Sequence, residues 1–433
     1  MPESNDINDT NKRDETATNL GAFREVPFMG VIFVVHEAMK RGFVNGHPDW
    51  SNLGQGQPEV GPMDGAPARI TDVRIEPQDH AYGPLEGIPE LREVVAAHYN
   101  RLYRKGMKSQ YTADNVCIAQ GGRLALSRAM IALGATRIGY QTPDYTAYED
   151  MFNLHLSRID TQLVRALPED GFVIPPARFE QEVAEHGFGA FVVSNPCNPT
   201  GALLQGDDLE RWIAIARQHD VSLLLDEFYS QFIYSAAGEP GPGPVSAAAF
   251  IEDVNREPFI LFDGLTKGYR YPGWRIGWAL GPPEIVESMA RTASALDGGP
   301  SRIAQRAAIE ALEPSRADQE TTAVRNVFSK KRNAMLETLK GFGVRFAHEP
   351  LGTFYCWGTL EDLPEPFNDA MNFFWKALDH RVMTVPGQFF DVNPGKGRKP
   401  PSPYEQWMRF SFGPPMDNML EGLDRLKQML ADG

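Results

Sequence analysis

The chain has 433 residues, of which 42% are hydrophobic and 23% are charged, so it can bury a large core and is not disordered as a whole. Its formal net charge of −15 repels phosphate backbones and makes nucleic acid a poor default partner. The 40 glycines and 34 prolines follow no period, which excludes a collagen-like chain and favours an α/β enzyme with many turns.

Polar residues dominate positions 1–20, and this composition predicts a disordered tail rather than a signal peptide. The longest early apolar run, residues 28–35, is far shorter than the ~20 residues that a membrane-spanning helix needs. The cysteines lie far apart, at Cys117, Cys197 and Cys356, and form no CxxC pair. This spacing argues against a zinc ribbon or redox motif, and we expect a cytoplasmic protein with no bound metal.

Between residues 82 and 281, short apolar runs alternate with amphipathic stretches. The pattern predicts strands at residues 115–118, 137–140, 190–194, 221–225 and 258–262. It predicts helices at residues 89–103, 123–133 and 207–219, the last with Asp207 as its N-cap and Glu210 completing a capping box. Strands that alternate with helices indicate a mainly parallel sheet covered on both faces, which binds ligands at the carboxyl ends of its strands.

After residue 297 the pattern changes and predicts a second, smaller α+β domain. We expect a long helical stretch at 301–341, an apolar run at 352–357, a helix near 368–380, the segment 382–385 and a final helix from Met416. Residues 391–406, rich in proline, glycine and basic residues, predict a surface loop. The expected parts are a tail (1–20), an N-terminal segment that joins the small domain (21–65), a three-layer α/β/α large domain (66–300) and the small domain (301–433).

Polar side chains follow two of the expected strands. Asn198 lies in the turn SNPCNPTG after the apolar run AFVV, although an Asn-Pro dipeptide alone more often only builds a turn. Asp226 ends the run VSLLLD, where a buried carboxylate is costly unless something pairs with it, and Tyr229 follows three residues later. Taken alone, Asp226 could equally begin a turn or cap a helix.

Lys267 follows a third buried strand, beside Thr266 and eight residues before Arg275. A semi-buried lysine with cationic neighbours has a lowered pKa and attacks carbonyl carbon, whereas a lone loop lysine is normally solvated. An acid, an amide and a lysine that is followed by an arginine thus all lie at the ends of expected strands. Pyridoxal phosphate explains them together, since it needs a lysine for its aldehyde, an acid for its ring nitrogen and a cationic cradle for its phosphate.

These segments resemble the class I/II aminotransferases, which share the aspartate aminotransferase fold (fold type I), and similar segments run in the family's order over residues 52–412. The resemblance implies that Lys267 forms a Schiff base with pyridoxal phosphate and acts as the general base. Asp226 would keep the pyridine nitrogen protonated, and Tyr229 and Asn198 would donate to the phenolic oxygen. The implied reaction moves an amino group between an amino acid and a 2-oxo acid by a ping-pong mechanism.

The resemblance also implies the surroundings of the cofactor. Tyr145 would stack on the pyridine ring, and Tyr82 would reach the phosphate of the neighbouring subunit in a homodimer with shared active sites; either tyrosine could instead pack in the core or an interface. Gly264 stands where many relatives have a phosphate-binding serine or threonine. The expected phosphate ligands are Gly121, Gly122 and Arg123, through backbone N–H groups that open a helix, together with Thr266 and Arg275.

On the substrate side, Arg409 in MRFSFG matches the family's arginine that grips the α-carboxylate, since a guanidinium binds a carboxylate with two hydrogen bonds. Gly56 in NLGQGQPE would let the backbone approach the substrate, and Asn198 would face it too. In the loop before Arg409, we interpret the basic side chains as solvated; they are Lys396, Arg398 and Lys399.

Two other functions stay open. A pyridoxal-phosphate lyase, cyclase or oxidase on the same fold would need the same Lys267, Asp226 and Arg409, so these residues do not discriminate. A non-catalytic ligand sensor would carry a DNA-binding winged helix before the domain, whereas about twenty polar residues precede it here. We expect an enzyme of amino-acid metabolism that binds neither nucleic acid nor membrane.

Overall fold

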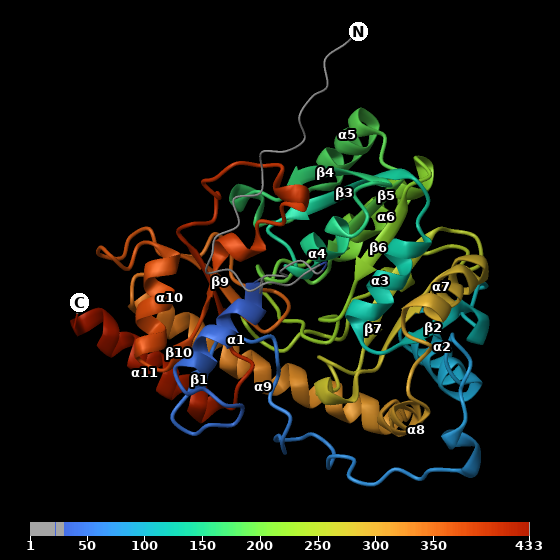
Figure 1. The fold of residues 1–433 in the computed structure, drawn as a ribbon, viewed down its shortest axis with the longest axis horizontal. Coiled ribbons are helices and arrows are strands. Elements are labelled where there is room, and N and C mark those ends of the chain that lie inside the picture. The colour runs from blue at the N-terminus through green and yellow to red at the C-terminus, as the bar shows by residue number, and fades with distance from the viewer. Residues whose placement is uncertain (1–21, 23–29, 433) are drawn as a thin grey trace.

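The computed structural model describes residue 22 and residues 30–432, so the tail expected at residues 1–20 lies outside the described part (Figure 1). A seven-stranded sheet runs in the order β2-β8-β7-β6-β5-β3-β4. All neighbouring strands from β7 to β4 are parallel, and β8 is antiparallel to both of its neighbours. The strands are β2 (Val116–Ala119), β3 (Thr136–Thr142), β4 (Ile159–Arg165), β5 (Ala190–Ser194), β6 (Ser222–Asp226), β7 (Phe259–Gly264) and β8 (Gly277–Leu280).

Helices enclose this sheet. Every residue of β2, β5, β7 and β8 is buried, and because successive side chains point to opposite faces of a strand, both faces must be covered. The predicted three-layer α/β/α arrangement with a mainly parallel sheet is therefore confirmed. The helices are α2 (Pro89–Tyr103), α3 (Gly122–Ala132), α4 (Ala147–Asn153), α5 (Pro176–His186), α6 (Gly206–Gln218) and α7 (Pro283–Leu296).

The start of α6 differs from the prediction. Gln205, not Asp207, is its N-cap, and Asp207 already lies in the first helical turn. A residue with helical backbone angles cannot act as the N-cap, so the expected capping box is wrong. The carboxylate of Asp207 still lies near the helix N-terminus, where negative charge is favourable.

The C-terminal elements form a smaller α+β unit. It contains α8 (Arg302–Ala311), α9 (Pro314–Gly341), α10 (Ala370–Asp379) and α11 (Met416–Asp432). An antiparallel sheet of β9 (Tyr355–Thr359), β12 (Trp407–Ser411) and β11 (Val385–Pro386) lies among them. The helical stretch expected at 301–341 is interrupted between α8 and α9, because Pro314 cannot continue the preceding helix.

An N-terminal segment lies beside these C-terminal elements. Helix α1 (Gly30–Lys40) is followed by β1 (Ser51–Asn52), which pairs in parallel with β10 (Val382–Met383). In Figure 1 the blue α1 and β1 lie beside the orange and red α10 and β10. This pairing brings residues 54–57, just after β1, toward the end of the central sheet.

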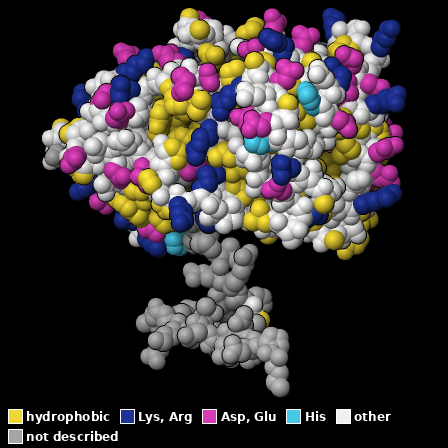
Figure 2. All heavy atoms as spheres, turned by 90° about the horizontal axis from the view of Figure 1, so that it is seen from above, with side chains coloured by type: hydrophobic (Ala, Val, Ile, Leu, Met, Phe, Trp, Pro, Cys, Tyr) yellow, Lys and Arg dark blue, Asp and Glu magenta, His cyan; other side chains and the backbone are white. Residues whose placement is uncertain are grey.

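Charged side chains of both signs lie on the surface (Figure 2). On the face shown in Figure 2, basic and acidic side chains are interspersed among the described residues, with no broad basic tract of the kind that nucleic-acid binding uses. No helix in the described part of the chain is long and apolar enough to span a bilayer.

Candidate active site

A cavity of about 330 Å³ opens near the carboxyl ends of β5, β6 and β7. It gathers side chains that are far apart in sequence, as expected for a parallel sheet. Tyr82 lies away from it with a 99% exposed side chain. The lining includes these residues singled out from sequence: Gly56, Gly122, Arg123, Tyr145, Asn198, Asp226, Tyr229, Thr266, Lys267, Arg275 and Arg409.

Lys267 follows β7 and reaches into the middle of the cavity. Its Nζ donates a hydrogen bond to the Gly56 carbonyl oxygen and lies 5.6 Å from the centroid of the Tyr229 ring. Burial, followed by the positive charges of Arg409 and Arg123, lowers the pKa of Lys267 to about 7. The amine is thus partly neutral near pH 7, the state in which it can act as a nucleophile or a base.

Asp226 ends β6 and is 5% exposed. The Tyr148 hydroxyl donates to Oδ2 over 3.0 Å, and the Phe228 backbone N–H donates to Oδ1 over 3.3 Å. Burial raises the pKa of Asp226 to about 6, although these hydrogen bonds and the charge of Lys267 oppose the rise. The carboxylate therefore favours a cationic partner inside the cavity.

Tyr148 was not among the predicted site residues. It lies in α4, three positions after Tyr145, and both tyrosines belong to the segment TPDYTAYE. Tyr145 lines the cavity and its hydroxyl accepts a hydrogen bond from Arg123 Nε at 2.8 Å. No spacing in the sequence distinguishes the tyrosine that faces the cavity from the one that reaches Asp226.

Arg409 lies on β12 and is 1% exposed. Its Nη1 donates to Asn198 Oδ1 over 2.8 Å, and its Nη2 donates to the Gly54 carbonyl oxygen. Its Nε is buried and has no hydrogen-bond partner among the described residues. An unpartnered buried N–H of a cation suits an anionic ligand in this cavity.

Asn198 is held by a short chain of hydrogen bonds. The Ser194 hydroxyl accepts from the Asn198 backbone N–H at 3.2 Å and donates to the buried Asp144 carboxylate. Asp144 also accepts from the Tyr145 backbone N–H at 2.7 Å. Sequence reasoning missed Ser194 and Asp144 in this role, because Asp144 reaches the turn only through the packing of β3 against β5.

The N-terminus of α3 closes another side of the cavity. Gly121, with φ +86°, is its N-cap, and a Cβ there would collide with the Arg275 guanidinium. Gly122 and Thr266 line the cavity beside them. Backbone N–H groups at a helix N-terminus beside a guanidinium make a cradle suited to phosphate.

Gly264 ends β7 in contact with the neighbouring backbone. A Cβ at this position would lie 2.6 Å from the Ile276 carbonyl oxygen and 2.7 Å from Gly277 Cα. These are backbone atoms that cannot turn away. The close pairing of β7 with β8 thus leaves no room for a side chain at this position.

This packing leads to a stability prediction. Gly264→Ala should lower the free energy of unfolding by about 1–3 kcal/mol, the usual cost of overpacking, measured as a fall in the thermal midpoint. Gly273→Ala, in the same loop region, is the matched control, because a Cβ there has no neighbour within 4 Å. Equal thermal midpoints for the two variants would show that β7 and β8 can separate at no cost.

The loop before Arg409 forms hydrogen bonds to elements of the large sheet, and one of its three basic side chains, Arg398, is half-buried rather than solvated as expected. Lys396 Nζ donates to the Glu149 carboxylate on α4. Arg398 donates to the Tyr140 hydroxyl over 2.9 Å and to Asp391 Oδ1 over 2.6 Å. Lys396 and Lys399 are exposed as expected. The prediction failed for Arg398 because its acceptor Tyr140 lies more than two hundred residues earlier in the chain.

Two further buried carboxyls adjoin this region outside the cavity lining. Glu227 accepts hydrogen bonds from the Ser246 hydroxyl at 2.5 Å and the Ala247 N–H at 2.8 Å, and burial raises its pKa to about 8. Asp263 accepts from the Ser230 hydroxyl at 3.0 Å. Among the described residues, no group of three or more His, Cys, Asp and Glu side chains could hold a metal ion.

Comparisons with known proteins agree with this geometry. Residues 48–426 match the family described as aminotransferase class I and II. The chain is 31% identical over 355 residues to an aspartate/prephenate aminotransferase of Thermus thermophilus, covering 81% of this chain and 83% of the relative. It is 26% identical over 417 residues to an LL-diaminopimelate aminotransferase of Moorella thermoacetica, covering 94% of this chain and 97% of the relative.

Solved structures show the same fold. An aspartate aminotransferase from Thermus thermophilus with maleate superimposes with a TM-score of 0.74 at 24% identity, covering 93% of this chain and 97% of the other. An aminotransferase from Mycobacterium tuberculosis gives a TM-score of 0.75 at 24% identity, covering 97% and 100%. The family match over most of the chain and the relatives in sequence lead to one conclusion: the chain belongs to the aminotransferase class I and II family and is an aminotransferase.

Proposed function

We propose that this aminotransferase binds pyridoxal 5'-phosphate in the cavity and uses it to move an amino group between an amino acid and a 2-oxo acid. The observation that carries the proposal is the meeting of Lys267, Asp226 and the glycine turn before α3 around one cavity. Each provides the chemistry that one part of the cofactor needs. Bound there, the cofactor would supply an aldehyde and a ring that takes up the electron pair released at the substrate's α-carbon.

We assign the cofactor contacts as follows. Lys267 is the lysine that attaches to the aldehyde, and Asp226 holds the proton of the ring nitrogen. Tyr229 and Asn198 donate to the phenolic oxygen, and Tyr145 covers the ring. The phosphate ligands are Gly121, Gly122, Arg123, Thr266 and Arg275, supported by the helix N-terminus and the guanidinium that adjoin there.

On the substrate side, Arg409 binds the α-carboxylate and Gly56 lets the backbone approach, with Asn198 beside them. Once the substrate amine has taken its place at the aldehyde, the freed Lys267 Nζ would accept the α-proton and pass it on, a general-base role that its lowered pKa of about 7 supports. The amino group stays behind on the loaded enzyme when the first 2-oxo acid leaves and is then passed to a second oxo acid, so we expect ping-pong kinetics.

We further propose a cytoplasmic homodimer with shared active sites. Tyr82 is 99% exposed, yet its loop is anchored, since Arg302 donates to the Tyr82 carbonyl oxygen at 3.4 Å and to Asp79 at 3.2 Å. A fixed, exposed tyrosine suits a role in a partner's phosphate site. Light scattering that found an active monomer would contradict this. The cysteines are all buried and unpaired, in keeping with a reducing compartment.

The arrangement of the sheets supports the proposed domain boundaries. The seven-stranded sheet lies entirely within the proposed large domain, residues 66–300, and the three-stranded sheet within the small domain, residues 301–433. The pairing of β1 with β10 supports the proposal that residues 21–65 join the small domain. Limited proteolysis that cut first within 116–280 would contradict these boundaries.

A screen of single amino acids tests the function. Cofactor-loaded protein is mixed with one amino acid at a time, and the absorbance of the cofactor and the release of 2-oxo acid are followed. The proposal predicts one 2-oxo acid released per active site and then a halt until an oxo acid is added. Continuous product formation without an acceptor would instead identify a lyase, cyclase or oxidase. Because two relatives are named for aspartate and for LL-diaminopimelate, these donors come first.

Asp226→Asn keeps the shape of the side chain and removes its charge. We expect cofactor binding to survive and single-turnover conversion of the amino donor to slow by about 10²–10³-fold, the usual effect of removing one electrostatic stabiliser. Stopped-flow absorbance measures the rate. Glu227→Gln is the matched control, because Glu227 is a buried carboxyl bound by Ser246 and Ala247. Equal slowing in both variants would mean that Asp226 has no special role.

The pKa of Lys267 predicts how cofactor attachment depends on pH. Burial and neighbouring cations lower this pKa from 10.5 to about 7, so the neutral, nucleophilic amine predominates above pH 7 and is lost below it. The rate at which the free protein attaches pyridoxal phosphate should rise between about pH 6 and 8 and level off above. A rate that kept rising through pH 9 would indicate an ordinary, solvated lysine.

A further inference from the structure

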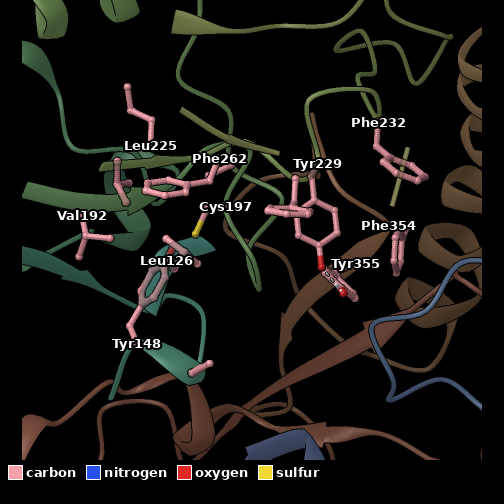
Figure 3. Close-up of a cluster of buried hydrophobic side chains, with 14 of the residues drawn as sticks. Leu126, Tyr148, Val192, Cys197, Leu225, Tyr229, Phe232, Phe262, Phe354 and Tyr355 are labelled. Carbon is pink, nitrogen blue, oxygen red and sulfur yellow. Dashed lines mark hydrogen bonds between the residues drawn. The ribbon is translucent and has the colours of Figure 1, made fainter. Parts of the chain in front are cut away.

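Tyr355 brings β9 into contact with two parts of the proposed site. Its hydroxyl lies 2.6 Å from the Tyr229 hydroxyl, and the Arg409 Cζ lies 4.1 Å from the centroid of its ring. The side chain is fully buried, and Figure 3 shows the two tyrosines joined by a hydrogen bond with Phe354 beside them. A tyrosine held in this way presents a fixed hydroxyl on one side and a fixed ring face on the other.

Gly56 leaves the space that this arrangement needs. A Cβ on Gly56 would lie 2.5 Å from the Tyr355 hydroxyl, 3.5 Å from Lys267 Nζ and 3.7 Å from the Tyr229 hydroxyl. The Tyr355 and Tyr229 hydroxyls and the Lys267 amine therefore surround the position that this Cβ would take, and only a glycine leaves that position empty. Tyr355 is thus placed beside the groups that handle protons, although it comes from a different sheet.

The geometry permits either hydroxyl to donate, and the proposed function decides between them. If Tyr229 donates its proton to the phenolic oxygen of the cofactor, its own oxygen must accept from Tyr355. Hydrogen bonds in series strengthen one another at low dielectric. A neutral phenol that donates to Tyr229 would therefore make Tyr229 a better donor.

We propose that Tyr355 is a positioning residue with two separable effects. Its hydroxyl holds the Tyr229 proton toward the cofactor, and its ring holds the plane of the Arg409 guanidinium toward the substrate carboxylate. The inference rests on the proposed function. Each effect acts through another residue, so each can be tested by removing either the hydroxyl or the ring.

The hydroxyl is tested by a double-mutant cycle of Tyr355→Phe and Tyr229→Phe, without substrate. The pH titration of the bound cofactor's absorbance gives an apparent pKa for each protein. A donor to the phenolic oxygen keeps this apparent pKa low, so Tyr229→Phe should raise it. Tyr355→Phe should raise it by roughly half a unit to one unit, the effect of one hydrogen bond. In the Tyr229→Phe background, Tyr355→Phe should cause no further rise in the apparent pKa, because the Tyr229 hydroxyl through which Tyr355 acts is missing.

Three outcomes would overturn the inference, and they are distinguishable. An equal shift from Tyr355→Phe in both backgrounds would show that its hydroxyl acts independently of Tyr229. No shift in the wild-type background would show that the hydroxyl has no effect. An unshifted Tyr229→Phe protein would refute the proposed role of Tyr229 itself, and with it this inference. Thermal midpoints of the Phe variants, which keep both rings, check that the fold is retained.

The ring is tested with 2-aminoisobutyrate, which carries an α-carboxylate but no α-proton. Binding to the cofactor-loaded protein is measured from the change in absorbance. Tyr355→Phe keeps the ring and should bind it as the wild type does, whereas Tyr355→Leu should bind it roughly 5- to 30-fold more weakly through loss of the cation–π contact. Methylamine, which lacks the carboxylate, should bind all three proteins alike. Equally weakened binding of 2-aminoisobutyrate in Tyr355→Phe and Tyr355→Leu, or unchanged binding in both, would contradict the role of the ring.

Discussion

Lys267→Ala is expected to abolish turnover, with a loss of roughly 10⁴-fold or more, because it would remove both proposed roles of Lys267, as the nucleophile for the cofactor and as the general base. Among the described residues, no second lysine lines the cavity that could take over. The variant should still bind pyridoxal phosphate through the other contacts, without a covalent link. Steady-state assays and denaturing gel filtration of the loaded protein measure the two effects.

A surface lysine provides the control for this result. Lys427 is exposed on α11, and Lys427→Ala should retain full activity and covalent cofactor. Addition of a small amine such as methylamine should restore part of the activity of Lys267→Ala, since it can enter the space and accept a proton. Activity within tenfold of the wild type in Lys267→Ala would contradict the proposed role.

Arg409→Ala is expected to reduce kcat/KM for amino and oxo acids by an amount equivalent to about 2–5 kcal/mol, or roughly 30- to 5000-fold, because it would remove one partner of the proposed ion pair with the substrate α-carboxylate. Arg409→Lys should not restore the loss, since an ammonium cannot form the two parallel hydrogen bonds of a guanidinium. The effect is specific to the carboxylate. Amines and aldehydes that lack a carboxylate should react about as before.

Comparing substrates with and without a carboxylate tests whether Arg409 binds the carboxylate. Arg409 is enclosed by aromatic rings, with its Cζ 4.1 Å from the Tyr355 centroid and 4.8 Å from the Phe390 centroid, so a truncated side chain leaves a space rather than a new contact. An Arg409→Ala protein that kept its preference for α-carboxylates would show that another arginine binds them. Arg123, which lines the same cavity, would then be the first alternative to test.

The central sheet, and the edge of it that borders the cavity, could be predicted from the positions at which apolar runs end in the sequence. Asn198, Asp226 and Lys267 each follow a strand whose residues are mostly buried, and parallel strands bring their carboxyl ends together. The edge strand β4 was missed, since its sequence IDTQLVR is only partly buried and lacks the continuous apolar run of a central strand. The break between α8 and α9 was marked by Pro314, which the long charged pattern obscured.

The residues that sequence reasoning missed are those that depend on contacts between distant parts of the chain. Tyr355 reaches Tyr229 across 126 positions of the chain, and Tyr148 reaches Asp226 across 78. Tyrosine is a common residue, and the local sequence around each of these two predicts ordinary core packing. Arg398 was misread for a similar reason, because its partner Tyr140 lies on a strand that is distant in sequence.

The most direct test of the account is to identify the lysine that carries the cofactor. Protein loaded with pyridoxal phosphate is reduced with borohydride, which makes the link permanent, digested, and analysed by mass spectrometry. The account predicts the added mass on the peptide that contains Lys267, in nearly all molecules, and none when an amino donor has first been added without an acceptor. A label on any other lysine, or a label that the amino donor does not remove, would contradict it.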